Sequence, residues 1–126
     1  MKLRHLFTVN IFFAIFFGLS CAVFPGLVHQ MYGLLPNDAS IWCTRLIGGS
    51  ILGFGTLMWF GRKTDSIDVR RAIALALLIQ DSIGTIASIE IQLSGAINAF
   101  GWSNIVLYGL LSLAYAYFLF IRPADC

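Results

Sequence analysis

The sequence predicts an all-α fold: an integral membrane protein whose four transmembrane helices form an antiparallel bundle, with both termini in the cytoplasm. The chain of 126 residues is 59% hydrophobic and 11% charged, and its mean hydropathy is +0.85. A soluble domain carries about 25% charged residues, and a soluble chain this short could not bury so much apolar surface in one core. The apolar residues also form four long runs, and most basic residues lie on one side of this pattern.

Each apolar run is long enough to be one membrane-spanning helix. Runs of about 20 residues cross a hydrocarbon core of about 30 Å as a helix. Backbone N–H and C=O groups cannot stay without hydrogen bonds in lipid, and a helix satisfies them within the span. The links are short and carry helix-breaking residues, so successive helices should pack side by side in opposite directions. Residues 1–126 are expected to form a single four-span domain. The predicted spans are about Leu6–Val28, Ile41–Phe60, Ala72–Leu93 and Trp102–Ile121.

The first of these spans resembles a signal peptide at its start. A basic beginning precedes an apolar run, and the step Leu19-Ser20-Cys21 resembles a lipoprotein cleavage site. The apolar run continues past Cys21, however, so we expect the segment to be retained as a true span.

The basic residues predict the orientation of the spans. Seven of the eight Lys and Arg residues precede the first span, lie between the second and third, or follow the fourth. Short loops rich in Lys and Arg stay in the cytoplasm, so both termini should be cytoplasmic in a multi-pass protein of the inner (plasma) membrane. The exception is Arg45, in the second span. The other seven are Lys2, Arg4, Arg62, Lys63, Arg70, Arg71 and Arg122.

Charge and cysteine usage exclude several classes of function. The net charge of +2 does not indicate nucleic-acid binding, and the basic side chains lie where anionic headgroups would meet them, so the expected partner is the lipid bilayer. Cys21, Cys43 and Cys126 have unrelated spacings, which predict neither a disulfide framework nor a metal site. Catalytic patterns such as Ser-His-Asp or a phosphate loop do not occur, so we expect no enzyme activity, and the sequence indicates no cofactor. His29 and Tyr32 are expected at the membrane interface.

The third span carries a stripe of polar residues. At 100° per residue, Asp81, Thr85, Ser88 and Gln92 fall within about 60° of one another. Such side chains are costly in hydrocarbon and normally face the bundle interior or a wet cavity. Glu90 lies on the opposite side of this helix, near its non-cytoplasmic end, where it can reach water.

The second span carries a comparable stripe of Arg45, Gly49, Gly53 and Thr56, within about 80° on one face. Gly49 and Gly53 form a small-xxx-small pair that allows another backbone to approach closely. We expect this face to pack inside the bundle, with homo-oligomerisation as the alternative. Matching the helix ends in depth brings Arg45 within reach of Asp81, so the sequence predicts an ion pair, direct or through water.

The first and fourth spans are expected to complete a polar network. Asp81 should lie opposite Ser112, where the phenols of Tyr108 and Tyr115 could hydrogen-bond its carboxylate. Lipid contact suits Phe12, Phe13 and Phe16 of the first span, which mostly point away from this network. Two interpretations remain open: polar side chains that hold the helices together, or a ligand or proton site around Asp81. The fourth-span face contains Gly101, Asn104, Tyr108, Ser112 and Tyr115, and the first-span face contains Asn10, Ala14, Gly18, Cys21 and Pro25.

The second span also resembles a known family. The stretch from Arg45 to Gly55, continued to Arg62, has the charged residue, paired glycines and basic end typical of the second helix in small DoxX-like membrane proteins. The turn at Gly101-Trp102 fits the uncharacterised bacterial branches of that superfamily. The resemblance covers about residues 41–121 and implies a four-helix bacterial membrane protein, often an accessory subunit. Several members carry Glu at the position of Arg45, which sets this chain apart from relatives with redox roles.

These observations favour a non-enzymatic integral membrane protein. It would bind a lipophilic or small ligand, or act as an accessory subunit of a membrane complex. The alternative is a small oligomeric transporter in which the Asp81 carboxylate couples transport to protons or ions. A membrane redox enzyme that uses quinone is the third and weakest interpretation.

Overall fold

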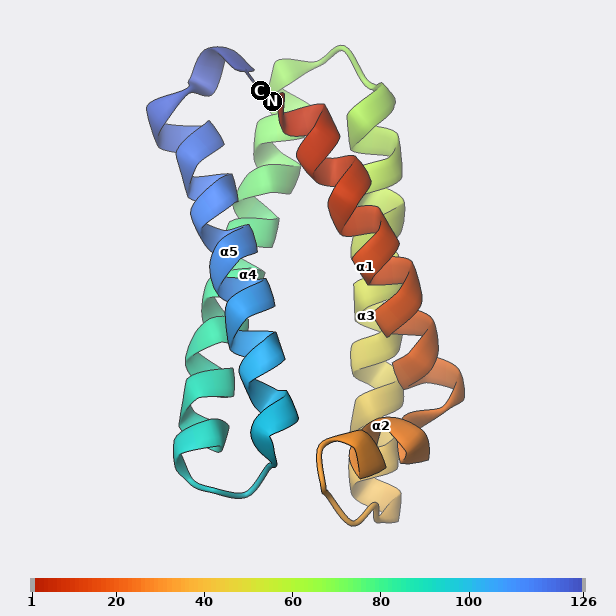
Figure 1. The fold of residues 1–126 in the computed structure, drawn as a ribbon. Coiled ribbons are helices and arrows are strands. Elements are labelled where there is room, and N and C mark those ends of the chain that lie inside the picture. The colour runs from red at the N-terminus through yellow and green to blue at the C-terminus, as the bar shows by residue number, and fades with distance from the viewer. Residues whose placement is uncertain (1, 126) are drawn as a thin grey trace.

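The computed structural model describes residues 2–125, and within this range the chain folds into helices without strands (Figure 1). Four of the helices are long and apolar enough to cross a membrane: Leu3–Val23, Asp38–Lys63, Ile67–Leu93 and Ala99–Ile121. The prediction of four apolar helices is therefore confirmed. In order, the elements are α1 (Leu3–Val23), α2 (Pro25–Met31), α3 (Asp38–Lys63), α4 (Ile67–Leu93), η1 (Ala99–Gly101), α5 (Trp102–Ala116), η2 (Tyr117–Ile121) and η3 (Pro123–Asp125).

The first span is shorter than expected, because the chain breaks before Pro25. A proline has no backbone N–H and cannot continue a helix, but it fits the first position of a new one. α1 accordingly ends at Val23, and Pro25 begins the short helix α2. α2 ends at a turn in which Gly33 has a φ of +74°, a conformation that glycine adopts without strain. Leu34 N–H donates to His29 O at 2.9 Å, which closes this turn.

The four long helices are arranged as two pairs. α1 packs along α3 and α4 packs along α5, whereas the contacts between the pairs are sparse. Figure 1 shows the pairs meeting near the two chain ends and diverging toward α2. We call the end with the termini and the α3–α4 connection the basic end, and the end with α2 and the α4–α5 connection the far end.

Glycines allow α1 and α3 to approach closely. A Cβ atom added to Gly48 would lie 2.7 Å from the carbonyl oxygen of Gly18 and 2.6 Å from the backbone nitrogen of Ala22. A Cβ added to Gly55 would lie 3.3 Å from Cβ of Ala14. Backbone-to-backbone packing over small residues is the usual way in which membrane helices associate, and here it joins the first pair.

The prediction that Gly49 and Gly53 pack inside the bundle is wrong for the single chain. Both are exposed, and a Cβ added to either would meet no atom within 4 Å. Arg45 and Thr56 are exposed on the same face of α3. The face that contacts α1 instead carries Gly48, one residue and about 100° around the helix. The polarity of Arg45 suggested an interior face, but the close helix contact determines which glycine is buried.

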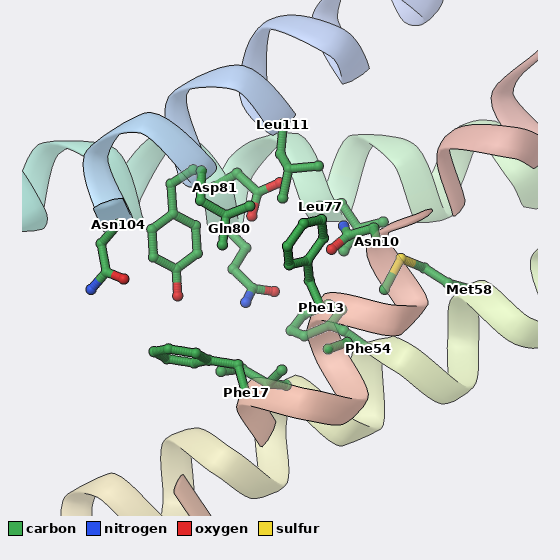
Figure 2. A pocket seen from close by; sticks show the side chains of 14 residues that line it. Asn10, Phe13, Phe17, Phe54, Met58, Leu77, Gln80, Asp81, Asn104 and Leu111 are labelled. Carbon is green, nitrogen blue, oxygen red and sulfur yellow. The ribbon is translucent and has the colours of Figure 1, made fainter. Parts of the chain in front are cut away.

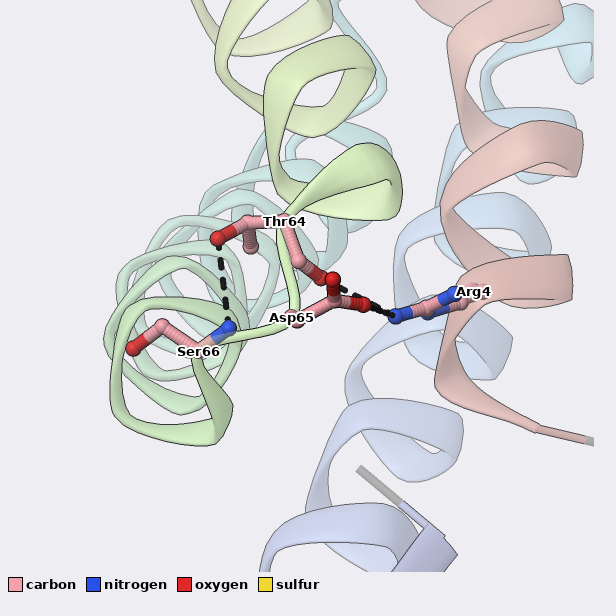
Figure 3. Close-up of polar contacts among 4 residues, drawn as sticks. All are labelled: Arg4, Thr64, Asp65 and Ser66. Carbon is pink, nitrogen blue, oxygen red and sulfur yellow. Dashed lines mark hydrogen bonds and ion pairs between the residues drawn. The ribbon is translucent and has the colours of Figure 1, made fainter.

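Apolar packing and hydrogen bonds close the basic end. Figure 3 shows Arg4 reaching the α3–α4 connection, where its guanidinium donates to Asp65 Oδ1 at 2.9 Å and to Thr64 O at 3.0 Å. Arg71 Nη2 donates to Pro123 O at 3.0 Å. The core beneath these contacts joins all four long helices, and its buried members include Leu3, Leu6, Phe7, Ile11, Met58, Ala74, Leu77, Leu111, Tyr115 and Phe118.

Candidate functional site

Asp81 is the buried acidic side chain of the helix bundle. It lies near the middle of α4, and 3% of its surface is exposed. Its Oδ2 atom is buried and receives no hydrogen bond from any described residue. A carboxylate removed from water is strongly destabilising unless it is hydrogen-bonded or paired with a positive charge. The carboxyl group of Asp81 is therefore a polar group whose partner is missing from the chain itself.

The Asp81 side chain lines a small cavity between the two helix pairs. Figure 2 shows Gln80 and Asp81 on α4 across this space from Asn10, Phe13 and Phe17 on α1. Asn104, Tyr108 and Leu111 line it from α5, and α3 contributes Ile51, Phe54 and Met58. The cavity has a volume of about 40 Å³, whereas one water molecule needs about 10–15 Å³ on this measure. The space therefore accommodates water or a head group of a few atoms, not a whole ligand.

A much larger apolar cavity adjoins this polar space. Its volume is about 700 Å³, and it lies between α1 and α2 on one side and α5 on the other. Ligand pockets usually measure about 300–1,000 Å³. Phe16 and Trp102 line this cavity and are 75% and 53% exposed, so its outer wall faces the surroundings of the bundle. The cavity shares Phe17 and Asn104 with the polar space around Asp81.

A third cavity, of about 300 Å³, extends from Asn104 and Tyr108 toward the far end. Cys21, His29 and Tyr32 form part of its wall. His29 and Tyr32 are each 7% exposed, so both side chains are buried within the chain, and their position at the membrane interface stays a prediction. The burial results from α2, which folds both residues back against the bundle.

Tyr32 joins the two helix pairs at the far end. Its hydroxyl donates to Asn104 Oδ1 at 2.7 Å, and its carbonyl oxygen accepts from Asn98 N–H at 3.0 Å. The Asn98 side chain also donates to Met31 O at 2.9 Å. Burial raises the pKa of the Tyr32 phenol above its ordinary value, so this hydroxyl remains a donor at neutral pH. We call Tyr32, Asn98 and Asn104 the far-end latch.

The structure places the predicted stripe of α4 on the less exposed side of the helix. Asp81 is buried, and Thr85, Ser88 and Gln92 are partly buried. Thr85 Oγ1 donates to the backbone oxygen of Asp81 at 2.7 Å, so it does not satisfy the carboxyl group. Ser88 lines the third cavity, and Gln92 Nε2 donates to Asn98 O at 3.4 Å.

The residues predicted on α5 divide into two groups. Asn104 and Tyr108 line the cavity with Asp81. Ser112 Oγ instead lies 2.8 Å from Ser82 Oγ. Tyr115 is fully buried, and its hydroxyl accepts from Asn10 Nδ2 at 2.8 Å and contacts Met58 Sδ at 3.6 Å. The predicted hydrogen bonds from Tyr108 and Tyr115 to Asp81 are not formed.

The predicted ion pair between Arg45 and Asp81 is also not formed. Arg45 is exposed on the outer face of α3, whereas Asp81 points between the helix pairs. The ion pair found within residues 2–125 joins Arg4 and Asp65. None of the three cavities has a Lys or Arg among its described lining residues. The negative group of Asp81 therefore has no positive neighbour in the cavity walls.

Sequence reasoning gave no role in the site to Gln80, Phe13 or Phe17. Gln80 Oε1 is buried and without a hydrogen-bond partner, and the signal for it was an amide next to the membrane carboxylate. Phe13 was expected to contact lipid; it is 46% exposed and also lines both the small cavity and the large apolar cavity. No sequence signal distinguishes a phenylalanine that faces lipid from one that faces an apolar pocket.

Metal and disulfide chemistry find no support in the described part of the chain. Cys21 is buried and Cys43 is exposed, and both are free thiols. Cys126 lies outside the described residues. Within residues 2–125 no three His, Cys, Asp or Glu side chains come close enough together to hold a metal ion.

Comparison of this chain with protein families, with curated proteins and with solved structures found no match. The resemblance to DoxX-like proteins therefore stays a prediction, and the case for a function rests on the cavity around Asp81.

Proposed function

We propose that this protein binds an amphiphilic small molecule within the membrane. The polar head of the ligand lies beside Asp81, and its apolar body occupies the aromatic cavity between α1, α2 and α5. One observation carries this proposal: a carboxyl group with a buried, unpaired oxygen lines a small cavity that also contains three amide side chains, and this cavity adjoins an apolar cavity of about 700 Å³. This combination of apolar volume with few polar groups is typical of small-molecule sites.

The proposed orientation has helices that cross the membrane in alternate directions, with both termini in the cytoplasm of a bacterial cell. Seven of the eight Lys and Arg residues support it, because they cluster at the basic end. The positive-inside rule assigns that end to the cytoplasm. The far-end latch and the mouth of the third cavity then face the non-cytoplasmic side.

Binding without catalysis fits the residues around Asp81. The other side chains of this cavity are amides, one phenol, phenyl rings, aliphatic groups and a thioether, and none of them forms a nucleophile–base pair with Asp81. An accessory subunit of a membrane complex could use the same site to hold a lipid or an amphiphilic cofactor for its partner.

A second candidate is coupled transport through the same site, and the asymmetry of the bundle favours it. The basic end is closed by a packed core and the Arg4–Asp65 ion pair, whereas the far end contains a cavity and a few hydrogen bonds. Transport requires that this asymmetry reverse, so that Asp81 is exposed to each side in turn. Four helices leave little room for a transport pathway within a single chain, so such a transporter would be oligomeric.

The test is to identify what the purified protein carries. Wild-type protein, Asp81→Leu and Glu90→Gln are extracted in native lipid discs, and small molecules are quantified by mass spectrometry against discs from cells without the protein. Glu90 is the matched control, because it is an exposed carboxylate on the same helix. We expect an amphiphile enriched with wild type and Glu90→Gln and lost with Asp81→Leu. Equal small-molecule content in all three samples and in the empty discs would refute a ligand site at Asp81.

A further inference from the structure

We infer that the head group recognised beside Asp81 is a protonated amine, so that the ligand is a lipophilic cation with N–H groups. This inference rests on the proposed function and specifies its ligand class. It follows from the charge, the hydrogen-bonding atoms and the aromatic rings of the cavity wall.

The charge balance of the cavity favours a cation. Asp81 is 3% exposed, and no Lys or Arg lies among the described residues that line the three cavities. An ionised carboxylate in a low-dielectric site is stable only when a positive charge pairs with it. An anionic ligand would place a second negative charge beside the first, and a neutral ligand would leave the carboxylate unpaired. An ammonium group supplies the missing counter-charge.

On residues that line the small cavity, the buried polar atoms without a hydrogen-bond partner are acceptors. Asp81 Oδ2 and Gln80 Oε1 are both buried without a hydrogen-bond partner, and both residues line the small cavity. A head group that satisfies these two atoms donates hydrogen bonds. A primary ammonium has three N–H donors and no acceptor, whereas a quaternary ammonium has the charge but no donor.

Aromatic rings surround the same space. Phe13, Phe17, Phe54 and Tyr108 all line the cavity with Asp81. The faces of aromatic rings carry negative potential and attract cations within about 6 Å. Only a head group of a few atoms fits the space of about 40 Å³, so the hydrocarbon part of the ligand must lie in the adjoining cavity.

The experiment compares head groups on a constant ten-carbon chain. Decylamine, decanol, decyltrimethylammonium and decanoate are titrated into protein in lipid nanodiscs at pH 7, with empty nanodiscs as the correction for partitioning. Decylamine is protonated at this pH, like a Lys side chain. The fluorescence of Trp102, which lines the apolar cavity, reports binding in a variant with Trp42→Phe and Trp59→Phe. Both replaced tryptophans are exposed.

We expect decylamine to bind at least about 10-fold more tightly than decanol, because hydrogen bonds to a charged group are the strongest available here. Decyltrimethylammonium should be weaker than decylamine, and decanoate should be weakest. Asp81→Asn should remove the preference for decylamine over decanol, whereas Glu90→Gln should retain it. The comparison of the four compounds on protein with native Asp81 needs no site variant to fold.

Two failures are distinguishable. If decanol binds as tightly as decylamine, and Leu107→Phe, which enlarges a side chain in the shared wall of the two cavities, weakens the binding of both, the amphiphile site stands and the amine inference is overturned. If no compound binds above the empty nanodiscs, or if neither Asp81→Asn nor Leu107→Phe affects binding, both the inference and the proposed function are overturned.

Discussion

Two neighbouring glycines of α3 allow a sharp test of the fold. The same change, glycine to alanine, is made at Gly48 and at Gly49. A Cβ at Gly48 would lie 2.6 Å from the backbone nitrogen of Ala22 and 2.7 Å from the carbonyl oxygen of Gly18. These are backbone atoms, so α1 must move away as a whole. A Cβ at Gly49 would meet no atom within 4 Å.

The expected energies follow from these contacts. Both variants gain about 0.5–1 kcal/mol, because alanine is the better helix former. Gly48→Ala also incurs an overpacking penalty of about 1–3 kcal/mol. We therefore expect Gly49→Ala to be slightly more stable than wild type, and Gly48→Ala to unfold more easily than Gly49→Ala by about 1–3 kcal/mol.

Thermal melting of both variants in one detergent, followed by circular dichroism, measures this difference. The oligomeric state is measured in parallel, because the exposed face with Gly49 and Gly53 remains the proposed surface for association of two copies. Equal stability of the two variants, or a larger loss at Gly49 in a monomeric sample, would show that α3 presents a different face to α1.

Three further outcomes are expected. Asp81→Leu should raise the unfolding free energy of the ligand-free protein in detergent by about 1–3 kcal/mol, because it removes an unsatisfied buried polar group; a loss measured by thermal melting would reveal a partner within the chain. Asn10→Leu and Tyr115→Phe should each lower stability by about 1–2 kcal/mol, and their double-mutant cycle should show coupling; strict additivity would argue against the 2.8 Å hydrogen bond. Reporter fusions after Gly33 and after Ser94 should both give a non-cytoplasmic signal, and a cytoplasmic signal at either position contradicts the proposed orientation.

The long helices and the polar face of α4 could be predicted because single-chain patterns determine them. Long apolar runs predict spans in any lipid environment, and a carboxylate such as Asp81 is too costly to face hydrocarbon. The face of the first span that contains Asn10, Ala14 and Gly18 was also predicted from its small and polar residues, and all three are buried.

The face of α3 that is buried against α1 could not be predicted in the same way. Gly48 and Gly49 are adjacent, so either could face the neighbouring helix, and the choice depends on which partner approaches. Arg45 favoured the wrong face because a long side chain can extend toward the headgroups from an exposed position. The predicted site omitted Gln80 and Phe17 for a related reason. Their role depends on the space between the two helix pairs, and the residue periodicity of a single helix does not reveal that space.

One end of the bundle is closed by a packed core and the other by a few hydrogen bonds, so the two helix pairs are hinged at the basic end. α1 with α3 and α4 with α5 form two stiff arms, and the core around Phe7 and Tyr115 is the joint. A rotation of about 10° at this joint displaces the opposite tips by about 5 Å, since each arm is about 30 Å long at 1.5 Å per residue. The three residues of the far-end latch are the only direct hydrogen-bonded restraint that the structure describes on this opening. An opening of this kind would admit molecules larger than the resting volume between the arms.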